Sequence, residues 1–381
     1  MKDAVAARQP GLRLTLAGDV MIGRGIDQVM PEPLPPQLYE SWVRDARDYV
    51  RLAERVNGPI GAPVALDHPW GVALAHMDRL DGAARIVNLE TAITRADRPW
   101  PGKGIHYRMN PAHVGCLVAA RIDACSLANN HVLDWGVPGL DETLATLRAA
   151  GIATAGAGAD PERAQAPAAL PLPGGGRLLL WAAATPDCGT TPEWAAQPGR
   201  SGIALLPRLD EDAAQGLAER VRRERGEHDV VVMSLHWGDN WVARLPAQQR
   251  AFAHRLIDLG AADIVHGHSS HHPLPIEVHA GKLVLHGCGD LINDYEGIAP
   301  REAQRSDLVC LYGATVERAG GRLLGLEIVP LQLRRFRLTQ PDDDERQWLL
   351  SRLDAECRRL GTRIEPDAQG RWQLRWQAGP R

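Results

Sequence analysis

One arrangement recurs along this chain and limits the folds open to it: a short apolar run ends, and a polar residue of a metal-binding type follows at once. The residues concerned are Asp19, Glu90, Asn130 with His131, His236, and His268 with His271. Short apolar runs are typical of buried β-strands, and strands alternating with helices favour an α/β fold. Because strand ends meet along one edge of such a sheet, the arrangement predicts a single site there.

The most concentrated part of the arrangement is the stretch 264–273, which carries four histidines in seven positions. It follows a largely apolar run, and small residues separate His266 and His268 from His271 and His272. Imidazole is the commonest metal ligand, and a turn of small residues lets several imidazoles converge on one ion. A histidine-rich surface loop has the same composition, so ligands from other strand ends must decide between the two interpretations.

Composition excludes several classes of function. The chain has 381 residues, enough for one large α/β domain or two domains, and its net charge of -4 gives no indication of a nucleic-acid partner or an anionic membrane. No apolar run is long enough to cross a bilayer, so we expect a cytoplasmic protein without a membrane partner. Its six cysteines include no Cys-x-x-Cys pair, and we expect free thiols.

Periodicity and turn residues predict the regular elements. The expected strands are 12–17, 84–91, 122–128, a short strand with a glycine turn within 152–158, 178–184, 229–235, 283–290, a hairpin of 307–316 with 322–333, and a short strand at 371–376. The main expected helices are 39–56, 71–80, 111–120, 140–150, 211–225, 248–260 and 345–360. Strands thus alternate with helices through most of the chain, as in an α/β protein.

Five motifs together resemble one family. In chain order they are Gly18-Asp19, Asn88-Leu89-Glu90, Asn129-Asn130-His131, His236-Trp237-Gly238 and Gly267-His268-Ser269-Ser270-His271. This order resembles the CapA-type proteins of poly-gamma-glutamate synthesis, which belong with the calcineurin-like metallophosphoesterases. The resemblance covers roughly residues 12–335. It implies an α/β, four-layer fold with two packed mixed β-sheets flanked by helices, a disordered N-terminus at 1–11, a metal-dependent domain at 12–335 and a C-terminal extension at 336–381 that packs on it.

The resemblance also implies roles for single residues. The metal ligands would be Asp19, Glu90 in the place of the bridging acid, Asn130, His236, His268 and His271. His131 would be the catalytic histidine, working as a general acid or orienting the substrate. From the residues alone, Asp134 either orients His131 or closes a turn, and both interpretations stay open.

Three further side chains are candidates for substrate binding. Arg24 lies in a loop with two glycines, Lys103 lies in the loop 99–108, and Trp237 follows a ligand histidine directly. Long ordered loops are often functional, and a basic residue there suits an acidic substrate. Solvated surface charge and a buried tryptophan are the alternatives.

The chain departs from the family pattern at the metal site. Superfamily members usually carry Asp-x-His on the first strand, whereas this chain has Asp19-Val20-Met21, and the bridging Asp is replaced by Glu90. A missing histidine weakens one of two metal positions. One oxygen-rich site for Ca²⁺ or Mg²⁺ is therefore as consistent as a pair of Mn, Fe or Zn ions, so we expect one or two divalent metal ions.

The motifs favour a CapA-like metal-dependent enzyme that acts on a peptide or glutamyl-peptide backbone. Three alternatives remain: a peptide Cα epimerase of a ribosomal-peptide pathway, a metallophosphoesterase, and a non-catalytic, metal-stabilised subunit of a capsule or polymer synthesis complex. For the epimerase, a second histidine–aspartate pair would come from His271 or His286 with Asp290 or Asp294. The expected partner is a peptide or small polymer substrate. The oligomeric state is left open by the sequence.

Overall fold

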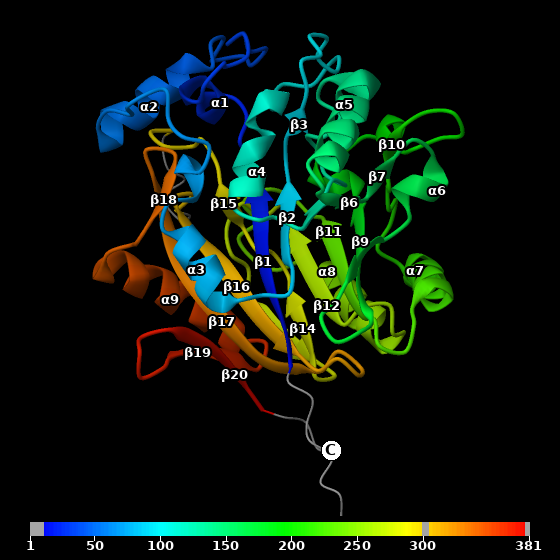
Figure 1. The fold of residues 1–381 in the computed structure, drawn as a ribbon. Coiled ribbons are helices and arrows are strands. Elements are labelled where there is room, and N and C mark those ends of the chain that lie inside the picture. Colours follow the sequence, from blue (N-terminus) through cyan, green and yellow to red (C-terminus); the bar gives the residue numbers. More distant parts are fainter. Residues whose placement is uncertain (1–10, 299–304, 378–381) are drawn as a thin grey trace, which may run out of the picture.

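The structure, a computed structural model, describes residues 11–298 and 305–377 and is organised around two mixed β-sheets (Figure 1). The first sheet contains, in spatial order, β19 (Thr362–Pro366), β20 (Trp372–Trp376), β17 (Leu323–Arg334), β16 (Leu308–Val316), β1 (Leu12–Val20), β2 (Arg85–Leu89), β5 (Ala124–Ser126) and β6 (Ala153–Ala155). Two short strands complete it, β15 (Asp290–Ile292) on β1 and β18 (Arg337–Thr339) on β17.

The second sheet contains β13 (Ile276–His279), β14 (Lys282–Leu285), β12 (Ile264–His268), β11 (Val230–His236), β9 (Arg177–Ala184) and β8 (Ala168–Pro171), in that spatial order. Its three central pairings, β14 with β12, β12 with β11 and β11 with β9, are parallel, and both edge pairings are antiparallel. Parallel central strands are buried on both faces, which explains the continuous apolar run before His236.

The two sheets pack face to face with helices on their outer faces. Alternate residues of the second sheet, such as Leu178 and Val232, join the core shared with the first sheet. Leu179 and Met233 point the other way and pack against α7 (Glu211–Glu224) and α8 (Ala247–Asp258). On the first sheet, α3 (Ala73–Leu80) covers β1 and β16 (Figure 1). The predicted α/β fold of two packed mixed sheets flanked by helices is confirmed.

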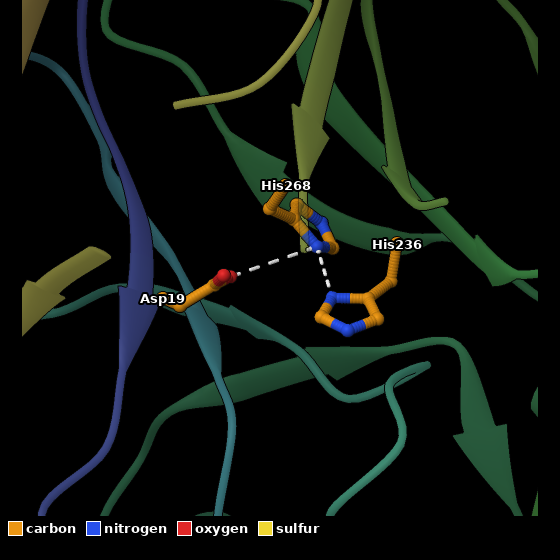
Figure 2. Close-up of side chains that lie close together, drawn as sticks. All are labelled: Asp19, His236 and His268. Carbon is orange, nitrogen blue, oxygen red and sulfur yellow. Dashed lines mark hydrogen bonds and ion pairs between the residues drawn. The ribbon is translucent and has the colours of Figure 1, made fainter. Parts of the chain in front are cut away.

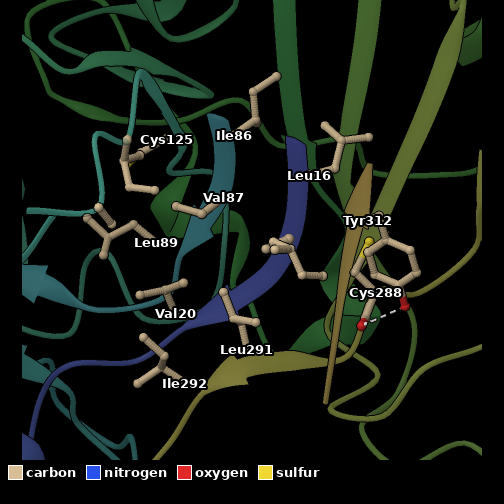
Figure 3. Packing of buried hydrophobic residues seen from close by; sticks show 14 of the residues in the cluster. Leu16, Val20, Ile86, Val87, Leu89, Cys125, Cys288, Leu291, Ile292 and Tyr312 are labelled. Atoms are coloured by element: carbon tan, nitrogen blue, oxygen red, sulfur yellow. Dashed lines mark hydrogen bonds between the residues drawn. The ribbon is translucent and has the colours of Figure 1, made fainter. Parts of the chain in front are cut away.

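The shared core is densely apolar around the central strands of the first sheet (Figure 3). Figure 3 labels Leu16, Val20, Ile86, Val87, Leu89, Cys125, Cys288, Leu291, Ile292 and Tyr312. The one polar atom of Tyr312 is satisfied, since its hydroxyl donates to the Cys288 carbonyl oxygen at 3.2 Å. All six cysteines are buried and unpaired, as predicted.

The predicted strand 283–290 is wrong, and the error matters for the site. β14 ends at Leu285 in the second sheet, whereas β15 begins at Asp290 in the first. Glycines at 287 and 289 carry the chain between the sheets, and Gly289 has a positive φ of 72°. β1 passes so close to this crossing that a Cβ at Gly18 would lie 1.8 Å from the Gly289 carbonyl oxygen.

The predicted helix 39–56 is also too long, since α2 spans Arg47–Asn57. Residues before it form a closed loop, in which the Leu38 amide donates to Arg44 and the Ala46 amide to Pro36. Prolines at 31, 33, 35 and 36 fix φ and remove donors, which favours this loop over an earlier helix start. The short strand expected within 152–158 is β6, and after Gly156, which has a positive φ of 88°, a second short strand follows, β7 (Ala157–Gly158).

The short helices α1 (Gly25–Val29) and α6 (Pro161–Ala164) were not predicted, whereas the other predicted helices agree with the structure to within a few residues or a turn. They include α5 (Gly136–Ala149), α4 (Gly115–Ala119) after a 3₁₀ turn at Pro111–Val114, and α9 (Asp343–Arg358), which starts with an Asp342–Glu345 capping box. β20 pairs with β17, so residues after 335 extend the first sheet. The predicted boundary at 335 stays a prediction, and the expected disorder at 1–11 falls almost entirely outside the described residues. Among those residues, no helix is both long and apolar enough to cross a membrane.

Candidate metal centre

Strand ends from both sheets meet at one buried point. Asp19 near the end of β1 faces His236 and His268, the last residues of β11 and β12 (Figure 2). The Nδ1 atoms of the two imidazoles lie 2.7 Å apart, and His268 Nδ1 lies 3.8 Å from Asp19 Oδ1. One ligand atom from each of the three lies within 4.8 Å of the others, so this first group is close enough to share one ion.

A second group shares Asp19. It contains His271 and Asp290, again with all three ligand atoms within 4.8 Å, and His271 Nδ1 lies 2.8 Å from Asp290 Oδ1. Ser269 and His271 have φ values of 90° and 58°, a left-handed backbone that reverses the chain between the two ligand histidines. Asp290 was not among the predicted ligands, yet β15 places it directly opposite Asp19.

Glu90 follows β2, and its surroundings show whether this site suits a cation. Both of its carboxylate oxygens are buried, and no described residue donates a hydrogen bond to them. His236 Nε2 and His131 Nε2 lie 3.7 Å and 3.8 Å from Glu90 Oε1. Burial, then the charges of Asp19 and Asp290, raise the pKa of Glu90 well above its ordinary value. A buried, unpartnered carboxylate is costly, so this environment fits a bound divalent ion.

The electrostatics of the other ligands agree with that fit. Burial, followed by the charge of Asp290, raises the pKa of Asp19 to about 7. Burial lowers the pKa values of His236 and His268 well below their ordinary value, which keeps both imidazoles neutral. Neutral imidazole is the form that binds metal, and one nitrogen of His268 is already held by Ser234 Oγ at 2.8 Å.

Two asparagines hold this arrangement in place. Asn130, a predicted ligand, brings its Oδ1 to 3.1 Å from His236 Nε2. Asn88 donates to Asp19 Oδ1 at 2.8 Å and lies 3.4 Å from His236 Nδ1, so it orients two ligands at once. Sequence reasoning gave Asn88 no role, although its position two residues before Glu90 on β2 places it on the same face of the strand.

His131 and Asp134 form a pair, as one of the two open interpretations held. His131 Nδ1 lies 2.7 Å from Asp134 Oδ2, and Lys103 Nζ contacts Asp134 Oδ1, His131 Nδ1 at 3.1 Å and the Asn130 carbonyl oxygen at 2.5 Å. Burial, then the Lys103 charge, lowers the pKa of His131 to about 4. Burial alone would raise the pKa of Asp134, but Lys103 and His131 outweigh it and lower that pKa.

Aromatic side chains border the centre. Tyr107 meets the His131 ring edge-on at 4.6 Å, and its hydroxyl donates to that of Tyr295 at 3.4 Å. Trp241 stacks on His271 at 5.2 Å. Arg24 lies behind this wall, 3.9 Å from the Tyr49 ring centroid, and is neutralised by ion pairs of 2.7 Å to Glu40 and 2.5 Å to Asp294. The predicted substrate-binding Arg24 is therefore an internal support, 4% exposed.

Three other residues singled out by the sequence belong to neither ligand group. Trp237 is in the core under α8 and donates to the His286 carbonyl oxygen, so the structure does not support substrate contact there. His266 Nε2 lies 2.8 Å from the Ala17 carbonyl oxygen, and His272 Nε2 lies 2.9 Å from that of Val242. Backbone carbonyl oxygens thus hold both of these histidines.

Residues 13–295 match the model of the family described as "Bacterial capsule synthesis protein PGA_cap". The chain belongs to this family. A "probable polyglutamine synthesis accessory protein" of Mycobacterium tuberculosis is 43% identical to it over 350 residues, 92% of this chain and 92% of the relative. "Capsule biosynthesis protein CapA" of Bacillus anthracis is 22% identical over 283 residues, 74% of this chain and 60% of the relative. The predicted CapA-type family is confirmed.

A solved structure of the calcineurin-like phosphoesterase YfkN from Bacillus subtilis aligns with 92% of this PGA_cap chain and 99% of its own. The sequence identity is 12% and the TM-score is 0.42. This likeness concerns the fold alone.

Proposed function

We propose that this chain is a metal-dependent enzyme that acts on the amide carbonyl of a peptide or glutamyl-peptide backbone during synthesis of a capsule-type polymer. The names of its relatives, a polyglutamine synthesis accessory protein and CapA, support the polymer. The observation that carries the metal dependence is Glu90, whose buried oxygens have no hydrogen-bond donor among the described residues. A role without a metal gives no reason to bury such a group beside two further carboxylates.

The first ligand group, Asp19, His236 and His268, would hold a divalent ion, with Glu90 next to it. A bound divalent ion polarises a carbonyl oxygen and lowers the pKa of water. The residues of this chain would supply proton transfer and binding. Because Asp134 engages Nδ1 of His131, the Nε2 atom is the one that faces Glu90 and is left to accept or return a proton.

One feature favours an amide over a phosphoester. Met21 occupies the place of the first-strand histidine, is fully buried, and meets the Tyr295 hydroxyl through its sulfur at 3.5 Å. A thioether is a poor ligand for hard ions, so the site has one nitrogen ligand fewer than is usual for phosphoesterases. Lys103 is ion-paired with Asp134 and lies 3.1 Å from His131 Nδ1, so its charge orients the proton-transfer pair.

Peptide Cα epimerisation is a second candidate, favoured by one specific observation. Two His–Asp pairs border the centre, His131 with Asp134 at 2.7 Å and His271 with Asp290 at 2.8 Å. Two pairs of this kind suit removal of a proton from one face of a Cα and its return from the other.

One set of assays separates these functions. Protein purified without added metal is analysed for metal content, then incubated with Mn²⁺ and an oligo-γ-glutamate, a model peptide in D₂O, or an aryl phosphate. We expect new amine ends from the oligo-γ-glutamate, lost in His268→Ala and retained in His228→Ala, a change at an exposed histidine before β11. Deuterium uptake without cleavage would support the epimerase, and vigorous aryl phosphate turnover the phosphoesterase. Metal retention with no turnover of any substrate would contradict the proposal in favour of a scaffold subunit.

A further inference from the structure

A groove opens beside the metal centre and has no role in the chemistry described so far. It encloses about 400 Å³ between α9 and the segments 243–245 and 272–275, which follow β11 and β12. Its floor is apolar, built by Leu274, Leu308, Leu349 and Leu353, all buried. Its lining includes three arginines, Arg244, Arg305 and Arg352. The groove therefore offers a ligand an apolar surface together with cationic side chains.

The charges of the groove are not balanced. Arg305 is paired with Asp307 at 2.6 Å and Glu345 at 2.9 Å, and the one acidic lining residue, Glu356, is paired with Arg359 at 2.8 Å. Arg244 and Arg352 are exposed, and neither forms an ion pair with a carboxylate of the described chain. Arg352 instead lies over the ring of Trp348, 5.0 Å from its centroid. Two positive charges therefore remain for a ligand.

The groove lies next to the metal centre along the chain. His272 lines it, and His271, the next residue back, belongs to the second ligand group. Trp241 stacks on both, with ring centroids 5.2 Å from His271 and 6.3 Å from His272. One end of the groove is therefore a direct neighbour of the second ligand group.

We propose that this groove binds an extended, carboxylate-rich polypeptide, a segment of a glutamyl polymer, and leads it to the metal centre. A glutamyl unit carries two methylene groups and one free carboxylate, so its carbons suit the leucine floor and its charges suit Arg244 and Arg352. Arginine forms paired hydrogen bonds with carboxylates, which favours it over lysine in such a role. The inference rests on the proposed function and adds the surface on which its substrate binds.

Binding can be measured without catalysis. The probe is a fluorescein-labelled oligo-γ-glutamate, followed by anisotropy on metal-free full-length protein, with oligo-γ-glutamine as the neutral probe and single-stranded DNA as another polyanion. The double variant Arg244→Glu/Arg352→Glu should weaken oligo-γ-glutamate binding about tenfold or more, since two attractive contacts become repulsive. Higher salt should weaken wild-type binding in the same direction.

The matched control is Arg222→Glu/Arg223→Glu on α7. It makes the same change of charge at two exposed arginines, and in Figure 1 α7 and α9 lie at opposite sides of the molecule. This control should bind as wild type does, and Arg244→Lys/Arg352→Lys should retain most of the affinity. Equal affinity of the Arg244→Glu/Arg352→Glu variant and wild type would overturn the inference, as would tighter binding of DNA than of oligo-γ-glutamate.

A further variant separates this inference from the proposed function. His268→Ala should lose turnover yet bind the labelled oligomer normally, because the groove does not include it. If the groove variants bind the oligomer as wild type does while metal-dependent turnover persists, the groove proposal is wrong and the proposed enzymatic function is supported. If the arginine substitutions weaken binding but no turnover is found, the groove proposal is supported and the catalytic proposal is wrong.

Discussion

Replacing Asp19 by asparagine should stabilise the metal-free protein at neutral to alkaline pH and abolish its stabilisation by metal. Burial raises the pKa of Asp19 from 3.8 to about 7. The folded state then holds a proton that the unfolded state has lost, so stability falls as pH rises from about 4 and levels off above about 7. The shift corresponds to about 4 kcal/mol lost by the charged form.

Replacement by asparagine does not recover the whole of this free energy. Asp19 accepts hydrogen bonds from Asn88 Nδ2 at 2.8 Å and from the Ser269 amide at 3.1 Å, and an amide side chain can accept only one of them. The lost bond costs about 1–2 kcal/mol, which leaves a net gain of about 2–3 kcal/mol near pH 8. Near pH 5 the carboxyl penalty is only about 1.5 kcal/mol, so the two effects cancel.

Urea unfolding with a chelator, at both pH values, measures this difference, and a repeat with Mn²⁺ should stabilise wild type alone. Asp134→Asn is the control of opposite sign. Asp134 is equally buried, but Lys103 and His131 together lower its pKa, so its charge contributes stability above its ordinary pKa. That variant should lose stability near pH 8. If Asp19→Asn destabilises the metal-free protein equally at both pH values, the reasoning is refuted.

Three further outcomes follow from the site. His268→Ala should fold but retain markedly less metal by elemental analysis, whereas His272→Ala should retain the wild-type amount, because only the former belongs to a ligand group. Asp290→Asn should lower the number of bound Mn²⁺ ions per chain, by removal of the ion shared with Asp19; an unchanged number would contradict a second position. All six cysteines should react with a thiol reagent only after unfolding, since burial raises the pKa of Cys116 and Cys188 to about 12; fast reaction in the folded protein would count against it.

The gathering of the candidate ligands was largely predictable because it depends on one simple rule. Residues that follow buried strands meet at one edge of the sheets, and Asp19, His236 and His268 lie together as this rule predicts. The same rule explains the misplaced Trp237: successive strand residues point to opposite faces, so a residue next to a ligand histidine faces the helices instead.

The position of Asp290 opposite Asp19 could not be predicted from the sequence. The run 283–290 looks like one strand with a polar tip, yet its glycines carry the chain from the second sheet to the first. A crossing of the chain from one sheet to the other leaves no trace in local periodicity, so the pairing of Asp290 with Asp19 could not be read from spacing. The groove beside α9 escaped for the same reason, because segments more than a hundred residues apart build it.

The close approach at Gly18 has a consequence for how this chain can vary. Any side chain there would meet the Gly289 carbonyl and push β1 away from β15. Asp19 and Asp290 project from these two strands, so the separation of their carboxylates is set by main-chain contact rather than by adjustable rotamers. A fixed spacing of this kind selects ions by radius. It also means that residue 18 cannot change without disturbing the metal site. A saturation library at residue 18, sorted for metal retention, should return glycine.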